Sequence, residues 1–478
     1  MASLASLSLN RPDCRGTNGG CESRGHTPCK VQWFLVDSDF AMRIDRLEIE
    51  NFKKFVKQTL ELHPQFTLFA GENGAGKTTV LDALAVAASI WLVEAPDSTL
   101  DNSGRNILTN EIRLEREIKG DRIQFQERRP VIIRAMGQIG DHQGVSWTRQ
   151  IRPHGKRTSN AEAKDALADI KAIYERDKTG QDVLCPVLAY YGAGRAWLAS
   201  NARFPKARPN GPARRWAAFY DCFSERIRFA ELNAWFRRET IERGNRRGSW
   251  RPGFEAVRRA ILRCVPNAEE VWFDTDLDQI VLCIEGNAQP FNNLSAGQRM
   301  MLALVADLAI KAVTQNAFLV PADELGPEDD PLPRVLKQTP GVVLIDELDV
   351  HLHPKWQRRV ARDLKETFPG IQFGCTSHSP QVVGELKPEE IRLLSGNDVT
   401  TPRRSFGIDS SRVLEELMDA KPRDESVADL LSRLFGLIDN EKFDDARNLL
   451  PEVEAKLGPD DPELTRARTL MTFLESEA

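Results

Sequence analysis

A short glycine-rich segment constrains the fold of this chain more than any other feature of its sequence. It is a glycine, four residues and then Gly-Lys-Thr, and it comprises Gly71, Glu72, Asn73, Gly74, Ala75, Gly76, Lys77 and Thr78. Glycines allow the tight turn that points successive backbone N–H groups at one anion, so the pattern predicts a phosphate-binding loop. Residues 65–70 predict a buried strand before the loop, and residues 78–85 predict a helix whose N-terminus faces the phosphate. Strand, loop and helix in this order indicate an α/β fold.

Two side chains at the end of this loop suit the binding of a nucleoside triphosphate. Lys77 supplies a mobile positive charge for the β- and γ-phosphates. The Thr78 hydroxyl is placed to bind Mg²⁺. We therefore predict that the stretch from Gly71 through Thr78 and Thr79 binds ATP together with Mg²⁺.

A second apolar strand ends in two carboxylates. Residues 342–345 are Val-Val-Leu-Ile, and Asp346 and Glu347 follow them directly. Two acids at the end of a buried strand are hard to explain structurally, because an unpaired buried charge is costly. We predict that Asp346 holds Mg²⁺ through water and that Glu347 is the general base for the attacking water.

Two further segments carry residues that suit contact with phosphate. Ser295 and Gly297 precede a long apolar helix, so they can donate hydrogen bonds to an anion at the helix N-terminus. His378 follows another apolar strand and can contact a γ-phosphate and sense its loss. Together these segments predict an ATPase in which Lys77, Glu347 and His378 are the catalytic residues.

Length and charge set broad limits on the rest. The 478 residues are enough for two or three domains, and no run of about 20 apolar residues spans a bilayer. Residues 201–260 hold 15 Lys or Arg against 6 Asp or Glu, whereas residues 408–478 hold 9 against 18. This asymmetry suggests one surface for an anionic partner and a separate acidic surface. Either stretch alone can equally be a solvated helical face.

Aromatic residues lie among the arginines of the basic stretch. They are Trp216, Phe219, Phe223, Phe229, Trp235 and Phe236. Aromatics between arginines can stack on nucleic-acid bases. They can equally form the core stripe of an amphipathic helix pair, and their helical spacing favours the core for most of them. Nucleic-acid contact through residues 203–259 therefore stays open as an alternative.

The first 41 residues differ from the rest of the sequence. They show no periodicity and lack the basic start and apolar core of a signal peptide. We expect them to be either disordered or no part of the natural chain, which would then begin at Met42.

The motifs resemble, in this order, those of the ABC-type ATPase heads of the SMC and RecF group. Leu294 to Gln298 looks like the ABC signature, with Ala296 in place of the usual glycine. Residues 51–53 are similar to the first hairpin of that family, which lies near the nucleotide.

The later motifs extend the resemblance to residue 394. Asp346 and Glu347 match the Walker B pair, residues 348–354 resemble the D-loop, and His378 matches the H-loop. The Q-loop glutamine of the family has no clear counterpart. Its candidates are Gln138, Gln150 and the strand end from Tyr190 to Arg195.

The resemblance implies how the site is completed. In this family the signature of one protomer completes the nucleotide site of the other, so a head-to-tail homodimer holds two ATP molecules between its subunits. Ser295, Gly297 and Gln298 would then contact nucleotide only in the partner's site.

The finer resemblance is to the compact ATPases of bacterial antiphage systems, the PtuA family of Septu systems and its retron-associated relatives. No long coiled coil separates the two halves of the head, and residues 188–195 and the tail from residue 411 look like theirs. The resemblance implies a cytoplasmic regulatory or sensor ATPase, without membrane contact, that acts with a separate HNH-type nuclease. The acidic tail or the inserted helices would dock that nuclease.

The implied fold is an α/β ABC-type P-loop ATPase head, a mixed sheet plus a helical lobe, with a helical insertion and an all-helical C-terminal tail. The expected parts are an extension at 1–41, an N-lobe with the phosphate loop and an antiparallel meander at 42–158, a helical insertion or lid at 159–290, a C-lobe with the signature, Walker B pair and H-loop at 291–407, and an acidic docking tail at 408–478.

Two other functions remain open from the sequence. One is a RecF-like repair ATPase that binds DNA directly, which would show strongly salt-dependent affinity for duplex DNA without a partner. The other is a nucleotide-gated scaffold that binds ATP and scarcely hydrolyses it. A transporter ATPase is disfavoured, because the roughly 200 residues between Lys77 and Ser295 exceed what a compact importer head needs.

Overall fold

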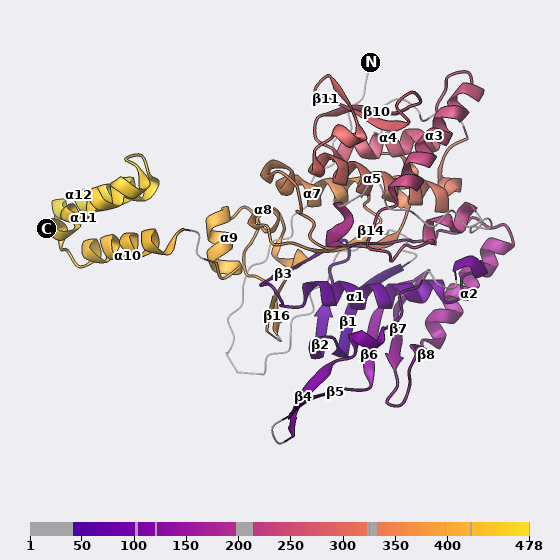
Figure 1. The fold of residues 1–478 in the computed structure, drawn as a ribbon, viewed down its shortest axis with the longest axis horizontal. Coiled ribbons are helices and arrows are strands. Elements are labelled where there is room, and N and C mark those ends of the chain that lie inside the picture. The colour runs from indigo at the N-terminus through magenta and orange to yellow at the C-terminus, as the bar shows by residue number, and fades with distance from the viewer. Residues whose placement is uncertain are drawn as a thin grey trace, which may run out of the picture. The chain divides into compact units, whose positions relative to one another are not determined.

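The computed structural model describes residues 42–100, 104–119, 122–196, 214–322, 325, 332–396, 398–420 and 423–477. The extension predicted at residues 1–41 lies outside the described residues. The head has the predicted α/β fold, built on two sheets with one helix between them (Figure 1).

The central sheet has six strands in the order β16-β15-β3-β14-β13-β9. Its strands are β3 (Phe66–Gly71), β9 (Val187–Tyr191), β13 (Gly341–Ile345), β14 (Ile371–Thr376), β15 (Ile391–Ser395) and β16 (Asp398–Thr400). All pairs are parallel except β15 with β16. The strands β9, β13 and β14 are buried along their whole length, as expected for a parallel sheet covered on both faces.

The second sheet is antiparallel, with the order β2-β1-β6-β7-β8. Its strands are β1 (Met42–Phe52), β2 (Phe55–Glu61), β6 (Val131–Ile139), β7 (His142–Ile151) and β8 (Ser159–Glu162). Helix α1 (Lys77–Ala88) packs against strands of both sheets (Figure 1). Its run of Val, Leu and Ala is buried on all sides, because this helix has no solvent face to cover.

The helical lobe covers the other face of the central sheet. Its elements are η5 (Arg214–Phe219), α3 (Phe229–Asn245), α4 (Pro252–Cys264), α5 (Ala296–Gln315), α6 (Arg334–Gln338), α7 (Pro354–Thr367) and a three-stranded sheet of β10 (Ala268–Asp274), β11 (Gln279–Ile284) and β12 (Asn287–Pro290). Helices α4, α5 and α7 share one apolar core with β3, β9, β13 and β14. This packing fixes the start of α5 relative to the strand ends.

The remaining α-helices and β-strands lie at the edges of the head or in the tail. They are β4 (Leu114–Lys119), β5 (Arg122–Glu127), α2 (Lys164–Lys178), α8 (Pro380–Val383), α9 (Ser410–Leu417), α10 (Glu425–Asp439), α11 (Phe443–Leu457) and α12 (Pro462–Glu477). Val413 of α9 belongs to the core of the head, whereas α10, α11 and α12 form an apolar core of their own around Leu434, Ile438 and Leu464.

Most of the aromatic residues in the basic stretch are buried in the core. Trp216, Phe219, Phe223 and Phe236 are all at most 9% exposed and belong to the two head cores. Their helical spacing correctly indicated core. These four rings are therefore not a stacking surface for nucleic acid.

Candidate nucleotide-binding site

The predicted catalytic segments meet at one edge of the central sheet. Strands β3, β14, β13 and β9 are neighbours and parallel, so their carboxyl ends lie side by side. The phosphate loop follows β3, Asp346 and Glu347 follow β13, and His378 follows β14. Ligands of open parallel sheets bind at this edge.

Glycine conformation shapes the phosphate loop. Gly74 and Gly76 have φ values of 76° and 101°, in the left-handed region that favours glycine. Gly76 is also the N-cap of α1, and a Cβ atom there would lie 2.7 Å from the ring of Phe55. The loop therefore needs glycine at this position for its backbone and for its contact with the first hairpin.

The Lys77 side chain reaches back across the loop and bonds to its backbone. Its Nζ donates to the carbonyl oxygens of Gly71 and Glu72, at 2.8 Å each. Burial lowers the pKa of Lys77 below its ordinary value, although the nearby carboxylates of Asp346 and Glu347 oppose that shift. An incoming phosphate would offer this ammonium a full anionic partner in place of two neutral carbonyls.

Asp346 and two threonines form a compact group of oxygen atoms. The hydroxyls of Thr78 and Thr376 donate to the two carboxylate oxygens of Asp346, at 3.0 and 2.6 Å. The backbone N–H of Asp346 donates to the carbonyl of Tyr191 at 2.8 Å. Hydroxyl and carboxylate oxygens are the ligands that Mg²⁺ prefers, so Thr78 and Asp346 fit the predicted metal site.

The backbone conformation of Glu347 differs from that of the strand before it. Its φ is 50°, which is uncommon for a residue with a side chain, and its N–H donates to Thr376 Oγ1 at 2.7 Å. The side chain is half-buried.

His378 is exposed, while its neighbours Ser377 and Ser379 are buried and hold the turn by hydrogen bonds to Asp349 and Gln357. The hydrogen bonds of the two serines fix the backbone on either side of His378, whose side chain is exposed to solvent.

The signature turn is formed and stabilised by hydrogen bonds at the start of α5. Ser295 is the exposed N-cap of α5, and it exchanges capping hydrogen bonds with Gln298. Gly297 packs so closely on the D-loop that a Cβ atom would lie 2.6 Å from the carbonyl oxygen of His351. The two motifs are about 50 residues apart in the sequence, and the fold brings them into contact.

Two charged groups near the loop escaped sequence reasoning. Lys54 Nζ donates to the carbonyl of Gly74 at 2.7 Å. Asp82 lies in the interior of α1 and accepts from Lys53 at 2.5 Å and from Arg105. The hairpin motif at residues 51–53 was a signal for Lys53, whereas nothing local to the sequence singles out Asp82.

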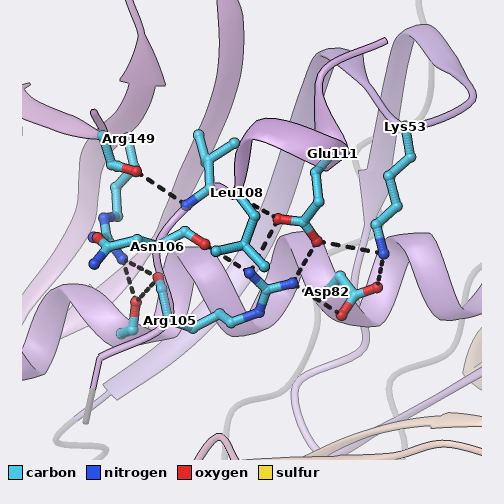
Figure 2. A network of polar contacts seen from close by, with 10 residues as sticks. Lys53, Asp82, Arg105, Asn106, Leu108, Glu111 and Arg149 are labelled. Carbon is cyan, nitrogen blue, oxygen red and sulfur yellow. Dashed lines mark hydrogen bonds and ion pairs between the residues drawn. The ribbon is translucent and has the colours of Figure 1, made fainter. Parts of the chain in front are cut away.

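Figure 2 shows the network that surrounds Asp82. Arg105 forms an ion pair with Glu111, which also accepts from the backbone of Leu108 at 2.9 Å. Although burial opposes it, the hydrogen bond from Arg105 holds the pKa of Glu111 below its ordinary value. Arg149, only 2% exposed, donates to the carbonyl of Val86 on α1 and to Asn106, and burial lowers its pKa to about 10. The network ties the first hairpin and the antiparallel sheet to α1.

Two of the Q-loop candidates are engaged elsewhere. The amide of Gln138 donates to the carbonyl of Gly140 at 3.0 Å, and that of Gln150 donates to Glu162 at 2.7 Å. Both glutamines are buried in the antiparallel sheet. The third candidate is the end of β9, and Tyr191 there accepts the hydrogen bond from Asp346 that is described above. The β9 end is therefore the candidate that touches the site.

Comparisons with known proteins agree with this geometry. A family model described as "AAA domain" matches residues 46–239, and one described as "AAA domain, putative AbiEii toxin, Type IV TA system" matches residues 285–384. The "Retron Ec83 probable ATPase" of Escherichia coli is 36% identical over 180 residues, which cover 37% of this chain and 31% of that protein.

Two further similar proteins have other origins. The "Septu protein PtuA" of Bacillus thuringiensis is 34% identical over 92 residues, 18% of this chain and 23% of that protein. The SMC head domain from Thermotoga maritima, a solved structure, is 14% identical over 76% of this chain and all of that one, with a TM-score of 0.40. The matched segments span less than a third of the retron and PtuA relatives.

The fold, the site and these relatives define the class of protein. Residues 46–239 and 285–384 match AAA domains, and the strand, loop and helix from Phe66 to Ala88 are those of a P-loop nucleotide-binding domain. Within that class it is related to the ATPases of retrons and to the PtuA proteins of Septu systems. No helix among the described residues is long and apolar enough to cross a bilayer.

Proposed function

We propose that this chain binds and hydrolyses ATP between two head-to-tail copies of itself and serves as the regulatory or sensor subunit of an antiphage defence complex. One observation carries the proposal. Lys77, Thr78 and Asp346 converge at the strand ends, whereas Ser295 lies exposed at the N-terminus of α5, where it caps its own helix. This arrangement supports a site whose first half lies within one chain and whose second half comes from a partner.

The residues present suit ATP with Mg²⁺. The loop from Gly71 to Thr79 would surround the phosphates, and Lys77 would exchange its carbonyl partners for phosphate oxygens. Thr78 and Asp346 would hold Mg²⁺, and the ion would neutralise charge on the β- and γ-phosphates. The hydroxyl–carboxylate contact already brings these two ligands together.

Hydrolysis then depends on the two residues beyond the strand ends. Glu347 accepts a proton from the attacking water, and its half-buried position limits competing solvent. Thr376 fixes the backbone of Glu347 and the carboxylate of Asp346 at the same time, so it sets the distance between base and metal ligand. His378 contacts the γ-phosphate and loses that contact when phosphate leaves.

The signature of the second copy would complete the site. Ser295 Oγ and the N–H groups at the start of α5 would donate to the γ-phosphate held by the other copy. Gly297 packs on the D-loop carbonyl of His351, so movement of the signature would reach the segment that follows Glu347. This contact offers a route from dimer closure to hydrolysis.

A nuclease of the HNH type is the partner that we propose for the ATPase. Support comes from the PtuA and retron relatives and from the tail. Residues 408–478 carry the acidic excess noted above, and α10, α11 and α12 have a core of their own. A separately folded acidic module suits the docking of a basic partner surface.

Mass and turnover measurements test the proposal. The purified chain should be monomeric without nucleotide, become dimeric with ATP and Mg²⁺ in light scattering, and release phosphate. Lys77→Ala should abolish both responses, and Lys57→Ala, which removes an exposed lysine of β2, should preserve them. A chain that stays monomeric at saturating ATP would contradict the dimer. Deletion of residues 423–477 should then leave turnover intact and abolish co-purification with the proposed HNH-type nuclease, and retained co-purification would contradict docking by the tail.

A further inference from the structure

A large cavity lies in the helical lobe, away from the phosphate loop. Its volume is about 1160 Å³, and its walls come from β9, η5, α3, α4 and α5. Small-molecule pockets typically measure about 300–1,000 Å³, so the space is ample for a ligand of that size or somewhat larger. None of the residues of the phosphate loop, the Walker B pair or the signature lines it.

Gln315, at the end of α5, is part of the cavity wall. Its side chain is 1% exposed, and neither its amide nitrogen nor its amide oxygen has a hydrogen-bond partner among the described residues. A buried amide without partners costs about 1–3 kcal/mol. None of the described residues offsets that cost, whereas a ligand in the cavity with both donors and acceptors would satisfy the amide once the wall opens to it.

Three arginines of the cavity wall differ from their neighbours in having no partner among the described residues. Arg228 and Arg251 form ion pairs with Glu231 and Glu242. The exposed arginine side chains that line the same cavity without a hydrogen bond or ion pair to any described residue are those of Arg226, Arg238 and Arg246. Guanidinium groups bind phosphate through paired N–H donors, so three unpaired ones favour a phosphorylated ligand.

Aromatic faces complete the chemistry of the wall. Tyr220 and Trp235 are half-buried, and Phe318 is 38% exposed. Trp235 stacks on Phe254 at 5.9 Å between ring centroids, which holds its ring in place. Aromatic rings of this kind stack on nucleobases regardless of their sequence. Four aromatics of the basic stretch are buried in the core, but Trp235 is accessible from this cavity.

We propose that this cavity is a second ligand site, separate from the ATP site, that binds a nucleoside phosphate. The guanidinium groups of Arg238 and Arg246 hold the phosphate, Trp235 or Tyr220 stacks on the base, and Gln315 bonds to its polar edge. The ligand is either a free nucleotide or the 5′-phosphorylated end of a single strand, since both carry the same chemical groups.

The cavity is also linked to the Walker B residues through Tyr191. Tyr191 lines it, and the Tyr191 hydroxyl donates to Asp307 of α5 at 2.6 Å. The carbonyl of the same tyrosine accepts from the N–H of Asp346. A ligand that moves the end of β9 therefore acts on both the metal-binding carboxylate and the helix that begins at the signature.

Two probes distinguish the sources of the ligand. They are deoxythymidine 5′-monophosphate and a 5′-phosphorylated tetrathymidylate, each titrated into the full chain carrying Lys77→Ala so that the phosphate loop does not contribute. Binding of the monophosphate with similar affinity to the tetramer indicates a free nucleotide as the ligand. Binding of the tetramer alone indicates a strand end. Absence of binding by both probes at 1 mM, roughly the weakest affinity of interest, overturns the proposal.

A matched pair of double variants tests the location. Arg238→Gln with Arg246→Gln removes two cavity arginines and should weaken binding about tenfold or more. Arg237→Gln with Arg247→Gln removes the adjacent arginines, which do not line this cavity, at the same cost in net charge. The second pair should leave affinity within about twofold. Equal weakening by both pairs would show general surface attraction and overturn the site.

Gln315→Leu provides an independent readout. The substitution removes an amide without partners, so the melting temperature of the unliganded chain should rise. Affinity for the bound probe should fall at the same time, because the ligand loses its polar contact. Unchanged or tighter binding would contradict the role of Gln315. ATP binding at the phosphate loop of the otherwise unaltered chain should stay the same, which separates this site from the proposed ATPase cycle.

Discussion

The phosphate-loop half of the nucleotide site and the signature half differ in what a single chain provides for them. Around the loop, Lys77, Thr78 and Asp346 already contact one another or neighbouring backbone across segments far apart in the sequence. Around the signature, Ser295 is exposed and caps only its own helix. One half is preorganised, and the other presents an exposed helix N-terminus.

This difference indicates which half of the site depends on folding alone and which half depends on dimerisation. The strand ends are positioned by the shared core, so folding alone builds the first half. The second half gains its function only by contact with another copy. Variants of the first half should therefore impair each chain by itself, and variants of the signature should impair only the pair.

Removal of the proposed general base should have the largest effect. Glu347→Gln should lower phosphate release about 100-fold or more while ATP binding is retained, because an amide cannot accept the proton of water. Single-turnover assays and nucleotide-binding titrations measure the two quantities. Glu366→Gln, at an exposed glutamate, is the control. If wild-type turnover is already negligible and Glu347→Gln behaves identically, the scaffold alternative is favoured.

A positioning residue should give the next largest effect. Thr376→Val keeps the shape of the side chain and removes its hydrogen bonds to Asp346 and to the N–H of Glu347. We expect turnover to fall about tenfold and the dependence on Mg²⁺ concentration to shift upward, as for other groups that orient metal ligands. Thr339→Val, which also removes a buried hydroxyl, should lower stability without shifting that dependence. Equal Mg²⁺ dependence in both variants would argue against a positioning role.

The network of Figure 2 should affect stability more than chemistry. Arg105→Ala would leave Asp82 and Glu111 buried with Lys53 as their remaining partner, which should cost about 3 kcal/mol of unfolding free energy. Chemical denaturation measures this loss. Arg134→Ala breaks a more exposed ion pair with Glu48 and should cost less than about 1 kcal/mol. Similar losses in the two variants would contradict the importance of the network.

The smallest expected effect concerns pH. His63 Nδ1 accepts from the N–H groups of Gln65 and Phe66 at the entry to β3, and burial lowers its pKa below 6.5. The unfolded chain therefore binds the proton more readily. The stability from neutral His63 is complete above pH 6.5 and decreases as pH falls toward the lower folded value.

A variant isolates this contribution. His63→Gln should flatten the decrease in melting temperature just below pH 6.5, relative to the unaltered chain. His154→Gln, at an exposed histidine, should keep the original slope. If His63→Gln leaves the slope of melting temperature against pH unchanged, His63 does not contribute to the loss of stability in acid.

Local patterns predicted the strands, the phosphate loop and the two acids, because each depends on residues adjacent in the sequence. The buried strand at residues 342–345 and the loop at residues 71–78 have the expected structure. The partnership of Thr376 with Asp346 depends on the order of strands in the sheet, which hydrophobicity along the chain does not specify. The partners of Asp82 likewise come from distant segments.

The Q-loop shows the same limit. Gln138 and Gln150 were candidates by residue type alone, and their amides are bonded within the antiparallel sheet. The end of β9 contacts Asp346 because β9 pairs with β13, and that pairing joins segments some 150 residues apart. The roles predicted for Glu347, His378 and the signature remain predictions until they are measured.

Mixing two inactive variants is the most direct test of the central claim. Lys77→Ala destroys the phosphate loop and keeps the signature, whereas Ser295→Arg blocks the signature and keeps the loop. Each mixed dimer has one intact composite site of two, so turnover should recover to between about a quarter of the wild-type rate, if all pairings form equally, and about half, if only mixed dimers form. A mixture that forms dimers but remains as inactive as its components would contradict a site shared between two chains.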